Sequence, residues 1–200
     1  MCANRIHAQL HQSGIRLGRE VLLQRKGQEQ LRALAPRLSV EQRRLIRTHL
    51  RLIKDVTEIL KGLRKQIRRV ARGSSMARLL QSVKGIGPYW SLLLSAELAP
   101  VSRFASVDHL VSYAGLAPIT KATGGHIRHG PLPKGANRWV RGAFVAATMS
   151  HVRYAPDSRL THYYERTKAR IGWKKARVAT ARKLARAVYG MLRTQRQWRG

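Results

Sequence analysis

An apolar seam with helical spacing runs through residues 40–72 and constrains the fold more than any other feature. Its members are Ile46, His49, Ile53, Val56, Leu60, Leu63, Ile67 and Val70. These positions alternate by three and four residues, which predicts a long helix with one apolar stripe. Ser39 and Gln42 stand three apart at its start and predict a capping box. We therefore expect a helical arm over residues 1–73, a hairpin or coiled coil whose first helix ends near Pro36.

The charge of the chain indicates its partner class. There are 40 Lys and Arg against 9 Asp and Glu, a formal net charge of +31. Such a chain repels itself unless a polyanion neutralises it. Nucleic acid is the first candidate, because protein cations that replace condensed counterions gain affinity by releasing them. A membrane partner is disfavoured, since no apolar run approaches the ~20 residues of a span and no broad apolar face carries interfacial aromatics.

Other features indicate the compartment and the assembly. The start of the chain lacks the apolar core of a secretory signal, and its one cysteine, Cys2, fits a reducing cytosol. We expect a cytoplasmic, nucleoid-associated protein. The apolar seam predicts a homo-oligomer through the arm, whose cationic faces are also compatible with a rod that lies against nucleic acid.

A hinge at Gly73-Ser74-Ser75 separates the arm from a second predicted domain, residues 74–200. This domain begins with a helix-hairpin-helix-like pattern, an apolar helix, a Gly-Ile-Gly turn and a second apolar helix. Gly85 and Gly87 would let the turn approach a phosphate, and the next helix would offer unpaired N–H groups. Lys84 adds a positive charge beside them. A plain helix turn is the alternative interpretation.

A long loop rich in glycine, proline and cations follows, around residues 116–136, and contains no clear run of alternating strand residues. Such a loop is difficult to order without a polyanion partner. The candidate nucleic-acid-binding residues in and after it are Lys121, Gly124, Gly125, His126, Arg128, Lys134, Asn137, Arg138 and Arg141. Thr123 offers a hydroxyl that could attack a phosphate if a neighbouring base activates it; a plain turn is the alternative.

Two helical stretches are predicted after the loop. Asn137 is a candidate cap for the first, and Ala155-Pro156 breaks it. Its apolar face comprises Val140, Phe144, Ala147 and His151, and that of the second comprises Val178, Ala181, Ala185, Val188 and Leu192. The overall prediction is a mainly α protein, an arm followed by a compact helical domain with a long ordered loop.

Metal chemistry is disfavoured within this chain. Residues 74–200 hold only four acids, Glu97, Asp108, Asp157 and Glu165, scattered along the sequence. Metal-assisted strand cleavage needs several carboxylates that converge on one site. We therefore expect neither a metal site nor another cofactor in the chain.

Six sequence blocks, in order, give a family resemblance. They are Val83–Pro88, Ala96–Leu98, Phe104–Pro118, Thr123–His126, Lys134–Arg141 and Ala181–Ala185. The segment from about Leu79 to Trp198 resembles the C-terminal domain of the IS110 family of bacterial insertion-sequence transposases, also called IS116 or IS902. The arm is similar to the coiled-coil linker that precedes this domain in the family.

The resemblance implies a fuller machinery than this chain contains. Family members begin with a RuvC-like domain bearing four acidic metal ligands, and Mg²⁺ is expected only with that domain. Their transposase domain supplies a serine nucleophile that joins covalently to DNA, and the proteins act as oligomers guided by a structured RNA. This chain starts at the linker, which indicates a truncated or split protein. It also has Ala122-Thr123 where many members carry two serines.

The resemblance therefore predicts a DNA-binding, RNA-guided transposase fragment that acts in DNA transposition and recombination. The alternative is a catalytically inactive nucleic-acid-binding module left from a truncated transposase. Whether the chain is an enzyme stays open at this stage, because the metal site is missing and the nucleophilic serine is replaced; we expect no activity from the chain alone.

Overall fold

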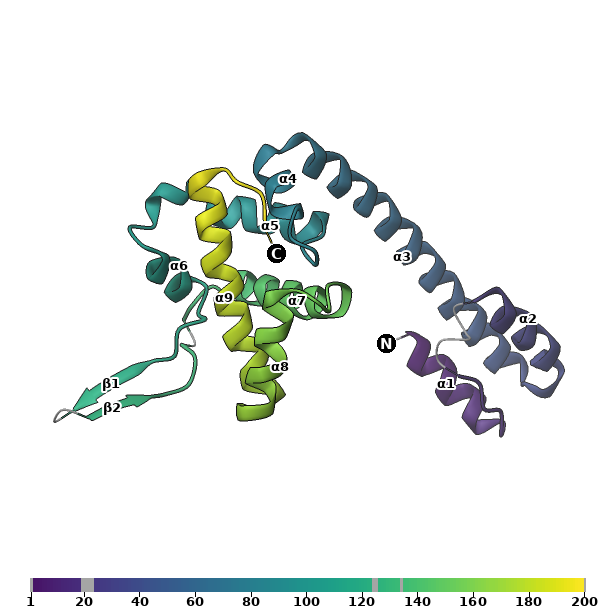
Figure 1. Cartoon of the computed structure of the whole chain (residues 1–200). Coiled ribbons are helices and arrows are strands. Elements are labelled where there is room, and N and C mark those ends of the chain that lie inside the picture. Colours follow the sequence, from purple (N-terminus) through teal and green to yellow (C-terminus); the bar gives the residue numbers. More distant parts are fainter. Residues whose placement is uncertain (1, 19–23, 124–125, 134, 200) are drawn as a thin grey trace. The chain divides into compact units, whose positions relative to one another are not determined.

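The computed structural model describes residues 2–18, 24–123, 126–133 and 135–199, and it confirms the mainly α fold (Figure 1). The chain divides into two compact units, Met1–Arg64 and Lys65–Gly200. The division falls within helix α3 (Val40–Gly73), upstream of the boundary predicted at residue 73, which stays a prediction.

The N-terminal unit contains α1 (Cys2–Gln12), α2 (Arg25–Leu34), the 3-10 turn η2 (Ala35–Arg37) and the first part of α3. Its buried core consists of Ile6, Leu10, Ile15, Leu31, Leu38 and Ile46. The predicted capping box at the start of α3 is confirmed. The Gln42 backbone N–H donates to Ser39 Oγ (3.2 Å), and the Ser39 N–H donates to Gln42 Oε1 (2.9 Å).

The arm differs from the predicted hairpin in its first part. Two helices, α1 and α2, precede Pro36 among the described residues, where one helix was expected. Gly14 adopts a φ of +69° just after α1, a conformation that favours glycine and that ends the helix. The second half of the α3 seam is solvent-exposed: Val56, Leu60 and Leu63 are 53%, 43% and 48% exposed. Its predicted pairing with another helix stays a prediction.

The C-terminal unit is a helical body organised around α9. Its helical elements are α4 (Ser75–Gln81), α5 (Pro88–Leu98), η3 (Val101–Arg103), α6 (Val107–Tyr113), α7 (Arg138–Tyr154), α8 (Arg159–Ile171) and α9 (Trp173–Thr194). Helix α9 contacts α4, α6, α7 and α8. The predicted apolar face of α7 is buried, as are Ala181, Ala185, Val188 and Leu192 of α9; Val178 is half-buried.

Two predictions for this unit are wrong in detail. Three helices, not two, follow the loop in the described part of the chain, because Ser158 caps a separate α8 and Gly172, with a φ of +78°, separates it from α9. The predicted loop also contains an antiparallel ribbon of β1 (Thr120–Thr123) and β2 (His126–His129). Its strands are too short for a visible alternation. In Figure 1 this ribbon, called the ribbon below, projects from the helical body.

Candidate nucleic-acid interface

The turn between α4 and α5 contains Lys84, Gly85 and Gly87. Lys84 is exposed. Gly87 is the N-cap of α5, with no side-chain cap bond, and a Cβ at this position would meet nothing within 4 Å. The N-terminus of α5 is therefore open at Gly87, as an approaching phosphate would require.

Gly85 has a packing role that its motif did not predict. Its φ is +104°, and a Cβ built on it would lie 2.5 Å from the Ala147 carbonyl oxygen and 2.6 Å from the His151 backbone nitrogen. Both atoms belong to α7. The close approach that requires glycine is thus made to a neighbouring helix of the same unit, and the phosphate contact predicted for Gly85 stays a prediction.

The register of the ribbon groups four predicted site residues. Thr123 pairs with His126, and Lys121 pairs with Arg128. Because paired residues share a face and residues two apart in a strand share a face, all four positions occupy one face of the ribbon. Gly124 and Gly125, which connect the strands, and Lys134 lie outside the described residues.

The base of the ribbon is hydrogen-bonded to the helical body. The ladder continues inward, as the Gly130 N–H donates to the Ile119 carbonyl (2.7 Å) and the Ile119 N–H donates to the Pro131 carbonyl (3.0 Å). The Asn137 N–H donates to the Tyr113 carbonyl (3.1 Å), which closes the segment onto α6. The ribbon therefore leaves the helical body from a fixed base.

A side-chain network joins three elements at this base. Glu97 Oε2 accepts from Tyr113 Oη–H (2.8 Å) and from Asn137 Nδ2–H (2.7 Å), and Asn137 Nδ2 also lies 3.0 Å from Tyr113 Oη. All three side chains are half-buried. A carboxylate that accepts two hydrogen bonds in such a place holds both donors firmly, so the network ties α5, α6 and the start of α7 together.

Asn137 has a structural role in this geometry. Its Oδ1 accepts from the backbone N–H groups of Trp139 (3.0 Å) and Val140 (3.1 Å), which confirms the predicted cap of α7. Together with the two Nδ2 contacts, these bonds use its full hydrogen-bonding capacity. The predicted contact of the Asn137 side chain with nucleic acid would therefore require this network to open.

The two arginines of this segment are placed differently. Arg141 is half-buried, and its Nη2 donates to the Pro133 carbonyl (2.8 Å). Arg138 is exposed on the first turn of α7 and is free to contact a polyanion. Arg103, which sequence reasoning did not single out, lies over the ring of Tyr113 (4.9 Å to the centroid) and donates from Nη2 to the Glu97 carbonyl.

A buried histidine joins the α4–α5 turn to the α7–α8 turn. His151 is 1% exposed; its Nδ1 lies 2.7 Å from the Lys84 carbonyl and its Nε2 lies 2.7 Å from Ser158 Oγ. Burial lowers the pKa of His151, despite the opposing effect of the hydrogen bond to Lys84. Burial therefore favours the neutral ring, with Nδ1–H donating to a carbonyl that can only accept. This contact supports the turn that presents Lys84.

In the part of the chain that the structure describes, no three His, Cys, Asp or Glu residues lie close enough together to hold a metal ion. None of the described helices combines the length and apolarity that a membrane crossing requires.

Sequence reasoning missed the Glu97–Tyr113–Asn137 network and the His151–Ser158 contact. In the sequence Glu97 stands only as one of four scattered acids, with apolar residues around it. That isolation was itself the available signal, because a half-buried carboxylate requires hydrogen-bond donors. His151 on an apolar helix face was a similar signal, since a buried imidazole also requires partners.

Comparisons with known proteins identify the C-terminal unit. Residues 77–165 match the Transposase IS116/IS110/IS902 family. The chain is 31% identical over 139 residues to the 43.6 kDa protein of insertion element IS110 from Streptomyces coelicolor, covering 69% of this chain and 34% of that protein. It is 25% identical over 139 residues to the 44.8 kDa protein of insertion element IS116 from Streptomyces clavuligerus, covering 70% and 35%.

The matched region coincides with the site described above. It begins in α4 and ends in α8, and it includes the turn, the network and the ribbon. The chain spans about a third of the length of these relatives. The resemblance predicted from the six sequence blocks is confirmed.

Proposed function

Since residues 77–165 belong to the Transposase IS116/IS110/IS902 family, we propose that this chain is the nucleic-acid-binding part of a transposase that acts in DNA transposition. The observation that carries the proposal is the ribbon. Its register groups Lys121, Thr123, His126 and Arg128 on one face, and the Glu97 network fixes its base. Two cations and a hydroxyl on a projecting element suit contact with a DNA backbone.

The partners in this proposal are DNA and a structured guide RNA. A net charge of +31 supports a polyanion partner. Lys84 is an exposed cation beside the uncapped N-terminus of α5, and Arg138 is exposed on the first turn of α7. Backbone contacts of this kind fix position without reading sequence. Binding should therefore be weakly sequence-dependent and fall with salt, with a log–log slope of roughly 0.9 per neutralised DNA phosphate.

The chemical step assigned to the chain is attack by the Thr123 hydroxyl. Its oxygen would form a bond to a DNA phosphorus while the bond to the leaving strand oxygen breaks, and that oxygen would take up a proton. His126, paired with Thr123 across the ribbon, is the candidate acceptor for the hydroxyl proton. In this proposal, metal-dependent steps are assigned to the RuvC-like domain that the family resemblance implies.

A second candidate function is a nucleic-acid-binding module without chemistry. The observation that favours it is Ala122-Thr123 in the segment preceding Gly124. Alanine has no hydroxyl, and the Cβ methyl of threonine crowds its oxygen, so attack is slower than from serine. Under this alternative, binding persists and no covalent intermediate forms.

A covalent-adduct assay distinguishes the two functions. Labelled insertion-element-end DNA is incubated with the chain, alone and with a RuvC-like domain supplied in trans, and adducts are resolved after denaturation. We expect none from the chain alone. With the added domain, the first function predicts an adduct that Thr123→Ser increases and Thr123→Ala abolishes. An adduct that survives Thr123→Ala would contradict the assignment of Thr123, and matched DNA affinities of both variants serve as the control.

We also propose that the chain assembles as a homo-oligomer through α3. Val56, Leu60 and Leu63 are exposed at heptad spacing, and an exposed apolar stripe on a long helix is stabilised by a second such stripe. Assembly would give two copies of the ribbon in one particle, as strand exchange between two DNA ends requires.

A further inference from the structure

A groove in the N-terminal unit lies between α2, η2 and the first part of α3, with a volume of about 660 Å³. Its floor includes Leu31, Leu38, Ile46 and Leu50. The first three are buried, with 5–6% of their surface exposed, and Leu50 is half-buried. The open aliphatic surface of the floor is therefore narrow and lies mainly on Leu50, above the core of the unit.

One wall of the groove is a row of cations on α3. Arg43, Arg47 and Arg51 are spaced four residues apart and Lys54 follows three residues later. Four residues of helix advance by about 6 Å, so the row places a positive charge at regular intervals along the groove. All four side chains are exposed.

Few acids accompany the row among the described residues: Glu41 lies near enough to Arg43 to interact with it electrostatically, and Asp55 lines the groove. Asp55 is the only acid among the residues that line the groove. The salt bridges between described residues lie elsewhere, at Lys61–Glu58, Lys168–Glu165 and Arg186–Asp108. Like charges held this close repel one another, which an anionic ligand would relieve.

The concave shape of the groove, with cations beside aliphatic side chains, indicates which class of ligand it suits. A single nucleic-acid strand presents phosphates along one side and the apolar faces of its bases along the other. It therefore matches a concave groove with cations on the wall and aliphatic side chains on the floor. A duplex hides its base faces by stacking and is convex, so it would leave the floor without a partner.

We propose that this groove binds a single-stranded segment of nucleic acid, with successive phosphates on the α3 cations and base faces on the aliphatic floor. The inference rests on the proposed function, because it assigns a strand of the nucleic-acid partner to a surface outside the family-matched region. It is a backbone-tracking site, so RNA and DNA strands of equal length should both occupy it.

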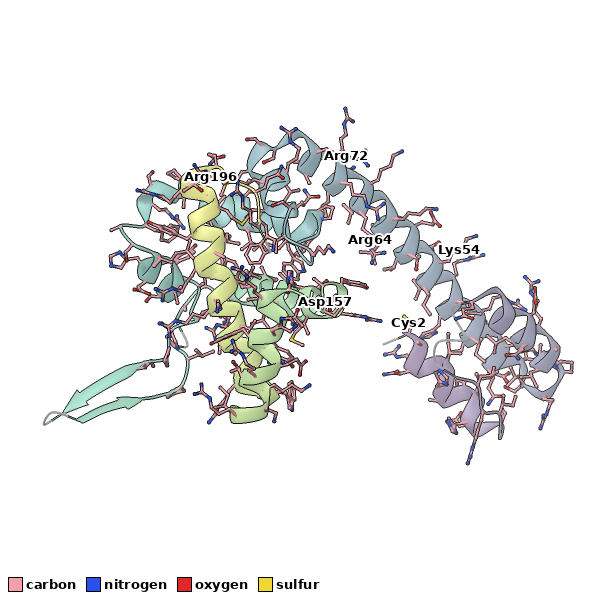
Figure 2. All side chains as sticks on the ribbon, viewed as in Figure 1. Cys2, Lys54, Arg64, Arg72, Asp157 and Arg196 are labelled. Atoms are coloured by element: carbon pink, nitrogen blue, oxygen red, sulfur yellow. The ribbon has the colours of Figure 1, made fainter. Side chains whose placement is uncertain are left out.

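The test compares two variants that remove the same charge from the same helix. The groove variant carries Arg43→Gln, Arg47→Gln and Arg51→Gln. The control carries Arg64→Gln, Arg68→Gln and Arg72→Gln, an equally spaced exposed row outside the groove. In Figure 2 the side chains of Arg64 and Arg72 project from α3. All six side chains are exposed, and circular dichroism checks that the full-length variants remain folded.

Binding is measured by fluorescence anisotropy with labelled single-stranded RNA, single-stranded DNA and duplex DNA over a salt series. The groove variant should lose on the order of tenfold more single-strand affinity than the control, and its salt slope should fall by about 2, at roughly 0.7 per phosphate contact. Duplex affinity should fall equally in both variants.

Equal single-strand losses in the two variants would overturn the groove assignment and leave the proposed function intact. A larger loss on the duplex than on the strands would overturn the single-strand assignment. A wild-type chain that binds none of the three ligands at low salt would instead overturn the proposed function itself.

Discussion

Replacing Gly85 by alanine should destabilise the C-terminal unit strongly. The residue has a φ of +104°, and the added Cβ would lie 2.5 Å from the Ala147 carbonyl oxygen and 2.6 Å from the His151 nitrogen. Both are helix backbone atoms, which cannot rotate away. Backbone strain of about 1–3 kcal/mol and overpacking of about 1–3 kcal/mol together predict a loss of roughly 2–6 kcal/mol. At about 2–4 °C per kcal/mol, the Tm should fall on the order of 10 °C.

Intrinsic tryptophan fluorescence reports on the unfolding of the C-terminal unit, where this loss of stability is expected. Every tryptophan of the chain, Trp90, Trp139, Trp173 and Trp198, lies in the C-terminal unit. The matched control is Gly87→Ala, where φ is −80° and no atom lies within 4 Å of the new Cβ. We expect it to cost less than about 1 kcal/mol.

A Gly85→Ala protein that melts within about 2 °C of the Gly87→Ala control would refute the packing explanation. The result also decides how binding data are interpreted. If Gly85→Ala unfolds the turn, its loss of nucleic-acid binding says nothing about a phosphate contact. Lys84→Gln, which removes an exposed charge and leaves the turn intact, is the direct test of that contact.

Three further predictions concern pH, the network and assembly. Burial lowers the folded-state pKa of His151, so the unfolded state takes up the proton first as the pH falls. The contribution of His151 to the urea midpoint should be constant above about pH 6.5 and fall below it. His151→Gln should reduce this dependence of the midpoint on pH. Asn137→Ala removes a cap and a Glu97 partner and should lower stability by about 2 kcal/mol in urea unfolding; an unchanged midpoint would argue against the network. Wild-type chain should be oligomeric by light scattering at tens of micromolar, and Val56→Glu with Leu63→Glu should give monomers; a wild-type monomer would contradict assembly through α3.

The sequence by itself was sufficient for features that depend on neighbours in the chain. The α3 seam, the capping box of Ser39 and Gln42 and the Asn137 cap all involve residues within a few positions of one another. Helical periodicity and capping are set by local backbone geometry, so the residue pattern predicts them directly. The prediction of a nucleic-acid partner came from charge, and the family resemblance came from ordered blocks.

The tertiary structure decided everything that depends on distant partners. Glu97 meets Tyr113 and Asn137 across 16 and 40 residues, and Gly85 is required because of backbone atoms of α7 more than 60 positions away. The ribbon register, which places Thr123 beside His126, depends on cross-strand pairing rather than on local preference. Such contacts depend on how the whole unit packs. A pattern of neighbouring residues therefore does not predict which atoms far apart in the sequence come into contact.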